Sequence, residues 1–205
     1  LVILGQSFNK SHILKLKKNF KHSEFVYYAR DSSRNFKNIS EIFPLFDRSY
    51  TFDEIDSKNN NNFKFLPLFY SYNNGSEFSD KKKRALLFMT IKKGKMEYIN
   101  KISKCINDII PLDKTLFLQS RLVFLYYKLT DSSFRNCKMK DFVYKRTSYK
   151  NALKTINEYK FIIDIPMKNQ TGLTIRTFEA LALNCKIITS NQYIKFYDFY
   201  NQDNI

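Results

Sequence analysis

The chain has 205 residues, and the hydrophobic share of 43% is enough to bury the core of one medium domain or two small ones. This composition excludes a collagenous, coiled-coil or wholly disordered polymer, and no apolar run approaches the roughly 20 residues that span a bilayer. The formal net charge of +16 admits three kinds of partner: nucleic acid, an anionic membrane surface or a phosphate-bearing substrate.

Lysine supplies most of the positive charge, with 27 Lys against 8 Arg. Asn, Ile, Phe and Tyr are also abundant, a combination that AT-rich codons produce, so part of the charge reflects genome composition. Arginine is the side chain favoured for bidentate recognition of phosphates and bases, and here it is scarce. We therefore expect no nucleic acid partner, although a basic nucleic-acid-binding module stays open as an alternative function.

The cysteines argue against a structural metal site. Cys105, Cys137 and Cys185 are odd in number and far apart, and the two histidines, His12 and His22, are distant from all of them. No Cys-x-x-Cys pair is present. Reduced thiols in a cytoplasmic protein are the simplest interpretation, with no zinc site.

The first seventy residues alternate strand-like and helical patterns. The run 24–29 (Glu-Phe-Val-Tyr-Tyr-Ala) has the aromatic and β-branched residues typical of strands. Apolar residues within 39–46 mark a short helical face, which Pro44 shortens. Strands separated by short helices favour a parallel sheet. We expect strands at residues 1–5, 24–29, 49–52 and 63–69, with helical stretches within 13–20 and 39–46.

Residues 70–83 break this alternation. Residues 72–76 (Tyr-Asn-Asn-Gly-Ser) have turn chemistry, and residues 80–83 (Asp-Lys-Lys-Lys) are a solvated charge run. We place a linker at 71–83, between an acceptor-side domain at 1–70 and a donor-side domain at 84–205. Because the chain opens in an apolar run without Met and stops without a closing element, we expect both domains to be incomplete at the chain ends.

After the linker the alternation restarts. The apolar residues of 96–110 recur with helical periodicity, whereas the run 122–129 fits a helix or a strand equally well. We expect strands at residues 85–91, 115–118, 161–165 and 186–189, and helices at 96–110, 149–159 and 173–183. The predicted fold class is α/β, with two Rossmann-like units.

The strand–loop–helix–strand pattern of residues 161–189 is the segment most able to bind a ligand. In open α/β sheets, ligands bind beyond the carboxyl ends of the strands. Gly172 lets the backbone turn closely, and Thr171 or Thr174 can cap the helix that follows. The N–H groups of the first helical turn then form an anion site.

Two charged residues extend this site along the helix. Glu179 can accept hydrogen bonds from the hydroxyls of a sugar, and Arg176 adds a positive charge. Together with the anion site they can seat a nucleotide diphosphate and its ribose. The same two residues also fit an ordinary surface pair on a capped helix.

A resemblance to a known family favours the first of these interpretations. Residues 170–183 (Gln-Thr-Gly-Leu-Thr-Ile-Arg-Thr-Phe-Glu-Ala-Leu-Ala-Leu) and 186–191 (Lys-Ile-Ile-Thr-Ser-Asn) resemble the donor-domain signature of bacterial lipopolysaccharide and capsular polysaccharide glycosyltransferases. Upstream, residues 28–32, 46–48, Phe52, Asp53, Asp56 and 65–70 are similar to the later part of the N-terminal domain of that family. The family has the GT-B fold, two Rossmann-like domains that face each other across a cleft.

The resemblance implies transfer of a sugar from a nucleotide-sugar donor to a lipid-linked or polysaccharide acceptor. It implies a cytoplasmic enzyme, peripheral on the inner face of the plasma membrane, that needs no metal and no other cofactor. The implied donor site places Glu179 on the ribose and residues 171–176 near the diphosphate. Its residues are Gln170, Thr171, Gly172, Leu173, Thr174, Arg176 and Glu179.

The sequence departs from the family pattern after the first strand of the donor domain. Met89 stands where the family has Gly, and Lys92 and Lys95 stand where it has His and Arg. We expect Lys92 and Lys95 to contact the diphosphate as point charges, without the fork of Arg. Thr171 stands where many retaining members carry a Glu, so the stereochemical class is not assigned.

The catalytic group is less well defined by the sequence. Asp31 follows the strand at 24–29 and fits either a cleft-facing acid or base or, as the favoured role, a cap of the next turn. Lysine runs at 15–18 and 81–83 are candidates for contact with an anionic membrane. A non-catalytic nucleotide- or membrane-surface-binding remnant of the fold is a second alternative, and we expect little or no transferase turnover from this chain alone.

Overall fold

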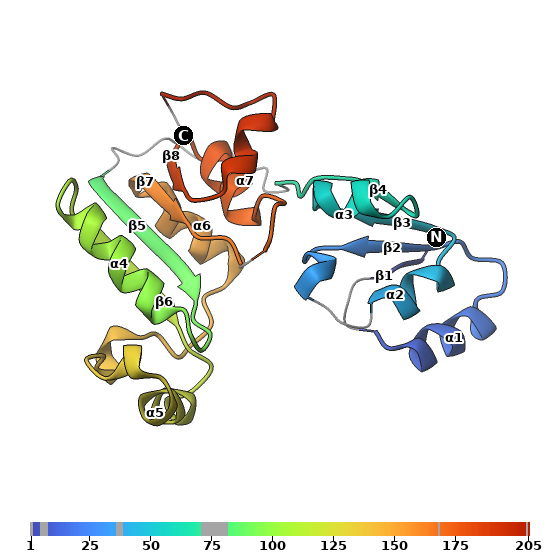
Figure 1. The fold of residues 1–205 in the computed structure, drawn as a ribbon, viewed down its shortest axis with the longest axis horizontal. Helices are drawn as coiled ribbons and strands as arrows, with labels where there is room; N and C mark the ends of the chain where they lie inside the picture. The colour runs from blue at the N-terminus through green and yellow to red at the C-terminus, as the bar shows by residue number, and fades with distance from the viewer. Residues whose placement is uncertain (1, 5–7, 36–38, 71–81, 168, 204) are drawn as a thin grey trace. The chain divides into compact units, whose positions relative to one another are not determined.

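The computed structural model describes residues 2–4, 8–35, 39–70, 82–167, 169–203 and 205 (Figure 1). Within these residues the strands form two four-stranded sheets. Strands β1 to β4 of one sheet and β5 to β7 of the other pair with their neighbours in parallel. The predicted α/β class with two Rossmann-like sheets is therefore confirmed.

The N-terminal strands form the first sheet, in the order β1-β2-β3-β4. Each strand pairs with the next along the chain, and since parallel neighbours need a crossover, short helices fill the connections. The expected strands at 1–5, 24–29 and 49–52 are all present. The elements are β1 (Val2–Leu4), α1 (Lys10–Asn19), β2 (Phe25–Ala29), α2 (Ile39–Ile42), β3 (Arg48–Thr51), α3 (Glu54–Asn59) and β4 (Phe63–Phe65).

Two features of this half differ from the sequence prediction. Helix α3 was not expected; it begins after Asp53, whose side chain accepts the N–H groups of Ile55 and Asp56. The strand expected at 63–69 ends at Phe65. Pro67 explains the early end, because it has no N–H to donate to a sheet.

The second sheet has the order β6-β5-β7-β8. Strand β5 lies between β6 and β7 and is parallel to both, and α4 packs against β6. The undecided run at 122–129 is helical, and the Ser120 side chain caps it by accepting the Val123 N–H at 3.2 Å. The elements are β5 (Lys82–Thr90), α4 (Met96–Asn107), β6 (Leu112–Phe117), α5 (Arg121–Thr130), α6 (Tyr149–Asn157), β7 (Tyr159–Asp164), α7 (Ile175–Ala182) and β8 (Lys186–Thr189).

The segment between β6 and α6, residues 118–148, has a small core of its own. It contains α5 and two short 3-10 helices, Ser132–Phe134 and Met139–Asp141. We call this segment the α5 excursion. Its backbone rejoins the sheet where the Val143 N–H donates to the Leu116 carbonyl at 2.8 Å.

The chain packs as two compact units that exchange segments. The first unit holds Leu1–Ser71 together with Ile165–Phe178 and Thr189–Tyr200, and the second holds Tyr72–Asp164, Glu179–Ile188 and Asn201–Ile205. Most of the linker predicted at 71–83 falls at residues 71–81, outside the described part of the chain. The domain boundaries drawn from the sequence stay a prediction. No helix among the described residues is long and apolar enough to cross a bilayer.

Candidate functional site

Of the two threonines that could cap α7, Thr174 is the one that does so. The N–H of Arg176 donates to Thr174 Oγ1 at 3.1 Å, and the N–H of Thr177 donates to the Thr174 carbonyl at 3.1 Å. Thr174 is therefore the residue that starts the helix. Thr171 has another task.

Thr171 and Gly172 hold the carboxylate of Asp53 within the first unit. The backbone N–H groups of Thr171 and Gly172 donate to Asp53 Oδ2 at 3.0 and 3.3 Å, and the Thr171 hydroxyl donates to Asp53 Oδ1. The Asp53 side chain is completely buried. The N–H groups of the loop before α7 thus bind a carboxylate of the protein itself, whereas the anion site expected at the first turn of the helix stays a prediction.

Asp53 remains charged in this buried position because its partners favour the carboxylate. Burial alone raises the pKa of Asp53, but the hydrogen bonds from Thr171, the charge of Arg34 and the Gly172 N–H together bring the pKa below its usual value. Arg34 Nη2 lies 2.7 Å from Asp53 Oδ2 and also donates to Thr171 Oγ1 at 3.2 Å. Asp53 caps α3 with the same carboxylate.

A second buried carboxylate completes this cluster. Asp56 is 4% exposed and accepts hydrogen bonds from the Ser33 hydroxyl at 2.7 Å and the Ser32 hydroxyl at 3.3 Å. Arg34 Nε lies 3.9 Å from Asp56 Oδ1. One guanidinium therefore faces two buried carboxylates, an arrangement in which every member depends on the others.

The carbonyl groups of the same loop are also fixed. Asn191 Nδ2 donates to the carbonyls of Thr171 and Gly172 at 3.1 and 3.3 Å, and Gln170 Nε2 donates to the Gly172 carbonyl at 3.0 Å. Since both the donors and the acceptors of residues 171–172 have partners, the conformation of the loop is set by the fold around it.

Gly172 lies directly against Phe52. The sequence predicts a close backbone turn at this glycine, and the structure adds a close approach to another segment. A Cβ atom at position 172 would lie 2.6 Å from the Phe52 carbonyl oxygen and 2.6 Å from its ring carbons. Only a residue without a side chain fits there.

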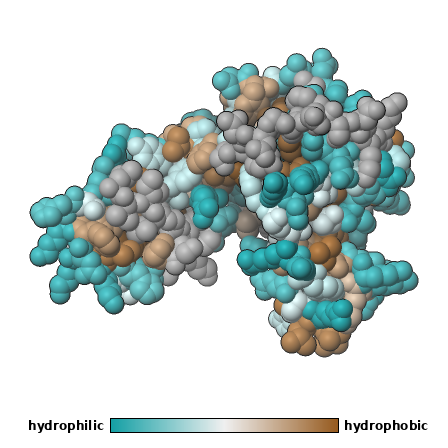
Figure 2. Space-filling view, turned by 180° about the vertical axis from the view of Figure 1, so that it is seen from behind, coloured by the Kyte–Doolittle hydropathy of each residue, from teal (hydrophilic) through white to brown (hydrophobic). Residues whose placement is uncertain are grey.

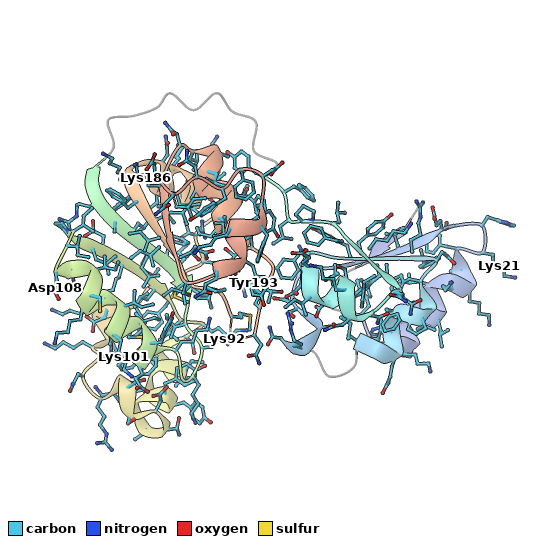
Figure 3. The ribbon with its side chains drawn as sticks, turned by 45° about the horizontal axis from the view of Figure 1, so that its top comes forward. Lys21, Lys92, Lys101, Asp108, Lys186 and Tyr193 are labelled. Carbon is cyan, nitrogen blue, oxygen red and sulfur yellow. The ribbon has the colours of Figure 1, made fainter. Side chains whose placement is uncertain are left out.

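Lys92 and Lys95 lie in the loop after β5, in the second unit. Lys92 is exposed, just beyond the end of β5 in Figure 3, and Lys95 is half-buried. Burial lowers the pKa of Lys95, and the charge of Lys92 lowers it further, while Asp164 at the end of β7 opposes the shift. The two lysines are therefore near enough to repel each other.

The turn that carries these lysines is tied to the α5 excursion. Gly94 has a φ of +80°, which favours glycine, and its N–H donates to Asp131 Oδ2 at 2.8 Å. Asp131 is the C-cap of α5. The position of the loop at 92–95 is thus coupled to the end of that helix.

The remaining predicted site residues have varied surroundings. Glu179 is 3% exposed and Leu173 is 1% exposed, whereas Arg176 is half-buried. Glu179 belongs to the second unit, while Leu173 and Arg176 belong to the first. Asp31 is half-buried, and its negative charge adds to the burial that raises the pKa of Tyr27.

Sequence reasoning missed most of the Asp53 cluster. Asp53 had a local signal, because an Asp just before a helical stretch is a typical N-cap, but it entered only through the family resemblance. Arg34 had no local signal, since its partners Asp53 and Thr171 lie 19 and 137 positions away. Among the described residues, no group of three His, Cys, Asp or Glu side chains is arranged to hold a metal ion.

No protein-family model matches the chain, and no curated protein matches it significantly. Among solved structures, the apo form of the lipopolysaccharide outer core galactosyltransferase WaaB is similar, with a TM-score of 0.48 and 11% identity over 91% of this chain and 56% of that chain. A protein from Listeria monocytogenes described as a UDP-N-acetylglucosamine 2-epimerase is also similar, with a TM-score of 0.43 and 8% identity over 92% of this chain and 56% of that chain. Both are GT-B proteins, and the present chain spans little more than half of their length. At these scores the similarity carries no conclusion about activity.

Proposed function

We propose that this chain is part of a GT-B glycosyltransferase and that it holds the nucleotide-sugar donor. The sugar would pass to a lipid-linked or polysaccharide acceptor of the bacterial surface. The observation that carries the proposal is the lysine pair Lys92 and Lys95 at the carboxyl end of β5, near Asp164 at the end of β7. Ligands of open α/β sheets bind at this edge, and two mutually repelling ammonium groups are stabilised by an anion between them.

The Asp53 cluster changes the roles assigned to the loop before α7. Because Thr171 and Gly172 donate to Asp53, they serve to anchor the loop rather than to bind a phosphate. The diphosphate contacts then fall to Lys92 and Lys95, within the second unit. Glu179 keeps its proposed role as acceptor for the ribose hydroxyls.

The chemistry required of such a site is modest. The site orients the donor, and positive groups stabilise the negative charge that develops on the diphosphate as it leaves. Lysine supplies this charge without the bidentate geometry of arginine. We therefore expect the lysine pair to contribute to binding of the diphosphate more than to selection of the sugar.

Calorimetric titration with nucleoside diphosphates tests the donor site. Lys95→Gln should weaken binding about tenfold or more, because a charged hydrogen bond is worth about 1.5–3 kcal/mol. Glu179→Gln, which keeps the shape of the buried side chain, should weaken nucleoside diphosphates but not inorganic pyrophosphate. The matched control is Lys101→Gln, on the exposed face of α4 and paired with Glu97 at 2.8 Å (Figure 3). Equal affinities of the folded parent and the Lys95→Gln variant would remove Lys95 from the site.

Three outcomes separate the alternatives. Tight oligonucleotide binding that nucleoside diphosphates do not displace would favour the basic nucleic-acid-binding module. Nucleotide-sugar binding without transfer to any acceptor would favour the non-catalytic remnant. A thermal-shift screen of nucleotide sugars would identify the donor, and multiple turnover with an acceptor panel would contradict the expectation of low activity.

A further inference from the structure

Helix α5 carries apolar side chains on two opposite faces. Its inner face packs within the α5 excursion: the Phe124 ring lies 5.6 Å from Phe142, and the Tyr127 ring lies 5.2 Å from Phe134. Phe124 and Phe134 are buried. The inner face is thus fully explained by the packing of the excursion on itself.

The outer face of α5 has no such explanation. With 3.6 residues per turn, four apolar side chains fall within an arc of about 100° on the side opposite Phe124. We call these four the outer stripe: Leu122 (76% exposed), Leu125 (45%), Tyr126 (55%) and Leu129 (87%). In Figure 2 hydrophobic residues gather at the lower end of the molecule, over this helix. A contiguous exposed stripe of this kind usually marks an interaction surface.

The segment that carries the outer stripe is strongly basic, although Lys128 is engaged with the carbonyls of Arg135 and Cys137 on the inner side. The α5 excursion (residues 118–148) contains seven basic residues against two acidic ones, a net charge of +5. Both acidic side chains have partners inside the protein, since Asp131 accepts the Gly94 N–H and Asp141 accepts the Lys138 N–H. Lys93, outside the excursion, places its Nζ 5.4 Å from the centre of the Tyr126 ring.

We propose that the outer stripe inserts into the interfacial layer of an anionic lipid bilayer. An apolar helix face beside Lys and Arg is the pattern by which interfacial helices bind such surfaces, where the leucines enter the acyl boundary and the basic groups meet lipid headgroups. A second copy of this chain fits less well, because it would bring two segments of charge +5 together.

This surface differs from the lysine runs at 15–18 and 81–83. Lys17 of the run at 15–18 is engaged within the protein: its Nζ donates to the Leu45 carbonyl at 2.9 Å and lies 3.6 Å from Asp47. Of the run at 81–83, Lys81 lies outside the described residues.

Vesicle sedimentation tests the proposal without any nucleotide, so its failure would leave the proposed donor site untouched. The intact chain is mixed with vesicles of phosphatidylcholine alone or with about a third phosphatidylglycerol, at low and high salt. We expect retention by the anionic vesicles, only partly reversed by salt. Leu122→Gln and Leu129→Gln should each lower the partition coefficient about five- to tenfold, because each removes an apolar side chain from the acyl boundary.

The matched control is Ile109→Gln, which removes a similarly exposed apolar side chain (84%) in the turn after α4 and should leave retention unchanged. Equal retention of the parent and the Leu129→Gln variant would overturn the proposal, as would an equal loss in the Ile109→Gln variant. Light scattering on the same samples tests the alternative partner, a second copy of this chain. A parent dimer that Leu129→Gln dissociates, with no retention by vesicles, would assign the stripe to contact between copies and refute a lipid partner.

Discussion

At the scale of single residues, Asp53 links parts of the chain that are distant in sequence. Its carboxylate caps α3, accepts the N–H groups of Thr171 and Gly172, and pairs with Arg34. A buried carboxylate is costly unless its hydrogen-bonding capacity is filled, and here several donors fill it. The cluster therefore stabilises the first unit and fixes the loop before α7 at the same time.

The Asp53→Asn substitution should destabilise the first unit by about 2–3 kcal/mol near neutral pH, because it removes the charge from these hydrogen bonds and leaves Arg34 poorly paired. The loss should depend on pH. The folded pKa of Asp53 is below the reference value of 3.8, so its stabilisation is fully present above that value and is lost as the pH falls through the folded pKa.

Urea unfolding of parent and variant at about pH 6 and about pH 3 measures this dependence. The difference between the two proteins should shrink at the lower pH. Glu97→Gln serves as the control, since its exposed pair with Lys101 should contribute less than about 1 kcal/mol. A constant difference between Asp53→Asn and the parent across this range would show that the charge of Asp53 is not what stabilises the cluster.

Gly172→Ala should destabilise the first unit by about 2–3 kcal/mol, because its Cβ would meet the Phe52 backbone, which cannot move aside as a side chain can. Gly94→Ala is the comparison. Gly94 has a positive φ, yet no atom lies within 4 Å of an added Cβ there, so the expected cost is about 1 kcal/mol. Thermal unfolding of both variants shows which substitution costs more stability. A smaller loss of stability at position 172 than at position 94 would contradict the close approach to Phe52.

At the scale of elements, the α5 excursion shows how a loop between a strand and a helix keeps its shape. Its aromatic rings form a cluster in which Phe134 and Phe142 stack with centroids 5.6 Å apart and planes 9° apart. Lys128 closes the cluster, since its Nζ donates to the carbonyls of Arg135 and Cys137. This internal core is what allows the opposite face of α5 to stay exposed without loss of the helix.

Phe134→Ala should cost about 3–4 kcal/mol, because Phe134 is completely buried and its removal leaves a cavity in the excursion. Tyr126→Ala, on the outer face of the same helix and 55% exposed, should cost less than about 1 kcal/mol. Hydrogen exchange of the α5 amides compares the two variants locally. Similar protection in both would mean that the aromatic cluster does not hold the excursion.

At the scale of the whole molecule, the chain crosses repeatedly between its two units. The loop after β7 and the first half of α7 pack in the first unit, and Glu179 onwards returns to the second. Of the residues that the sequence favours for the donor site, Arg176 therefore lies in one unit, and Lys92, Lys95 and Glu179 lie in the other.

Much of this fold was predictable from local patterns. Helical periodicity placed α4, β-branched and aromatic runs placed β2, β5 and β7, and the Gly-Leu-Thr stretch placed the start of α7. These features depend on residues within a few positions of one another, so a single sequence contains their cause. The family resemblance added a function to them, which remains a proposal.

Two features were decided only by the tertiary structure, because they depend on residues far apart in the chain. The family resemblance places residues 171–176 near a diphosphate, and in the structure the N–H groups of Thr171 and Gly172 donate to Asp53, 118 and 119 positions away. The structure likewise turned the ambiguous run at 122–129 into a helix with one face buried and one exposed. In both cases the outcome depends on which buried groups become hydrogen-bond or packing partners. The tertiary fold sets those partners, because they lie far apart in the sequence.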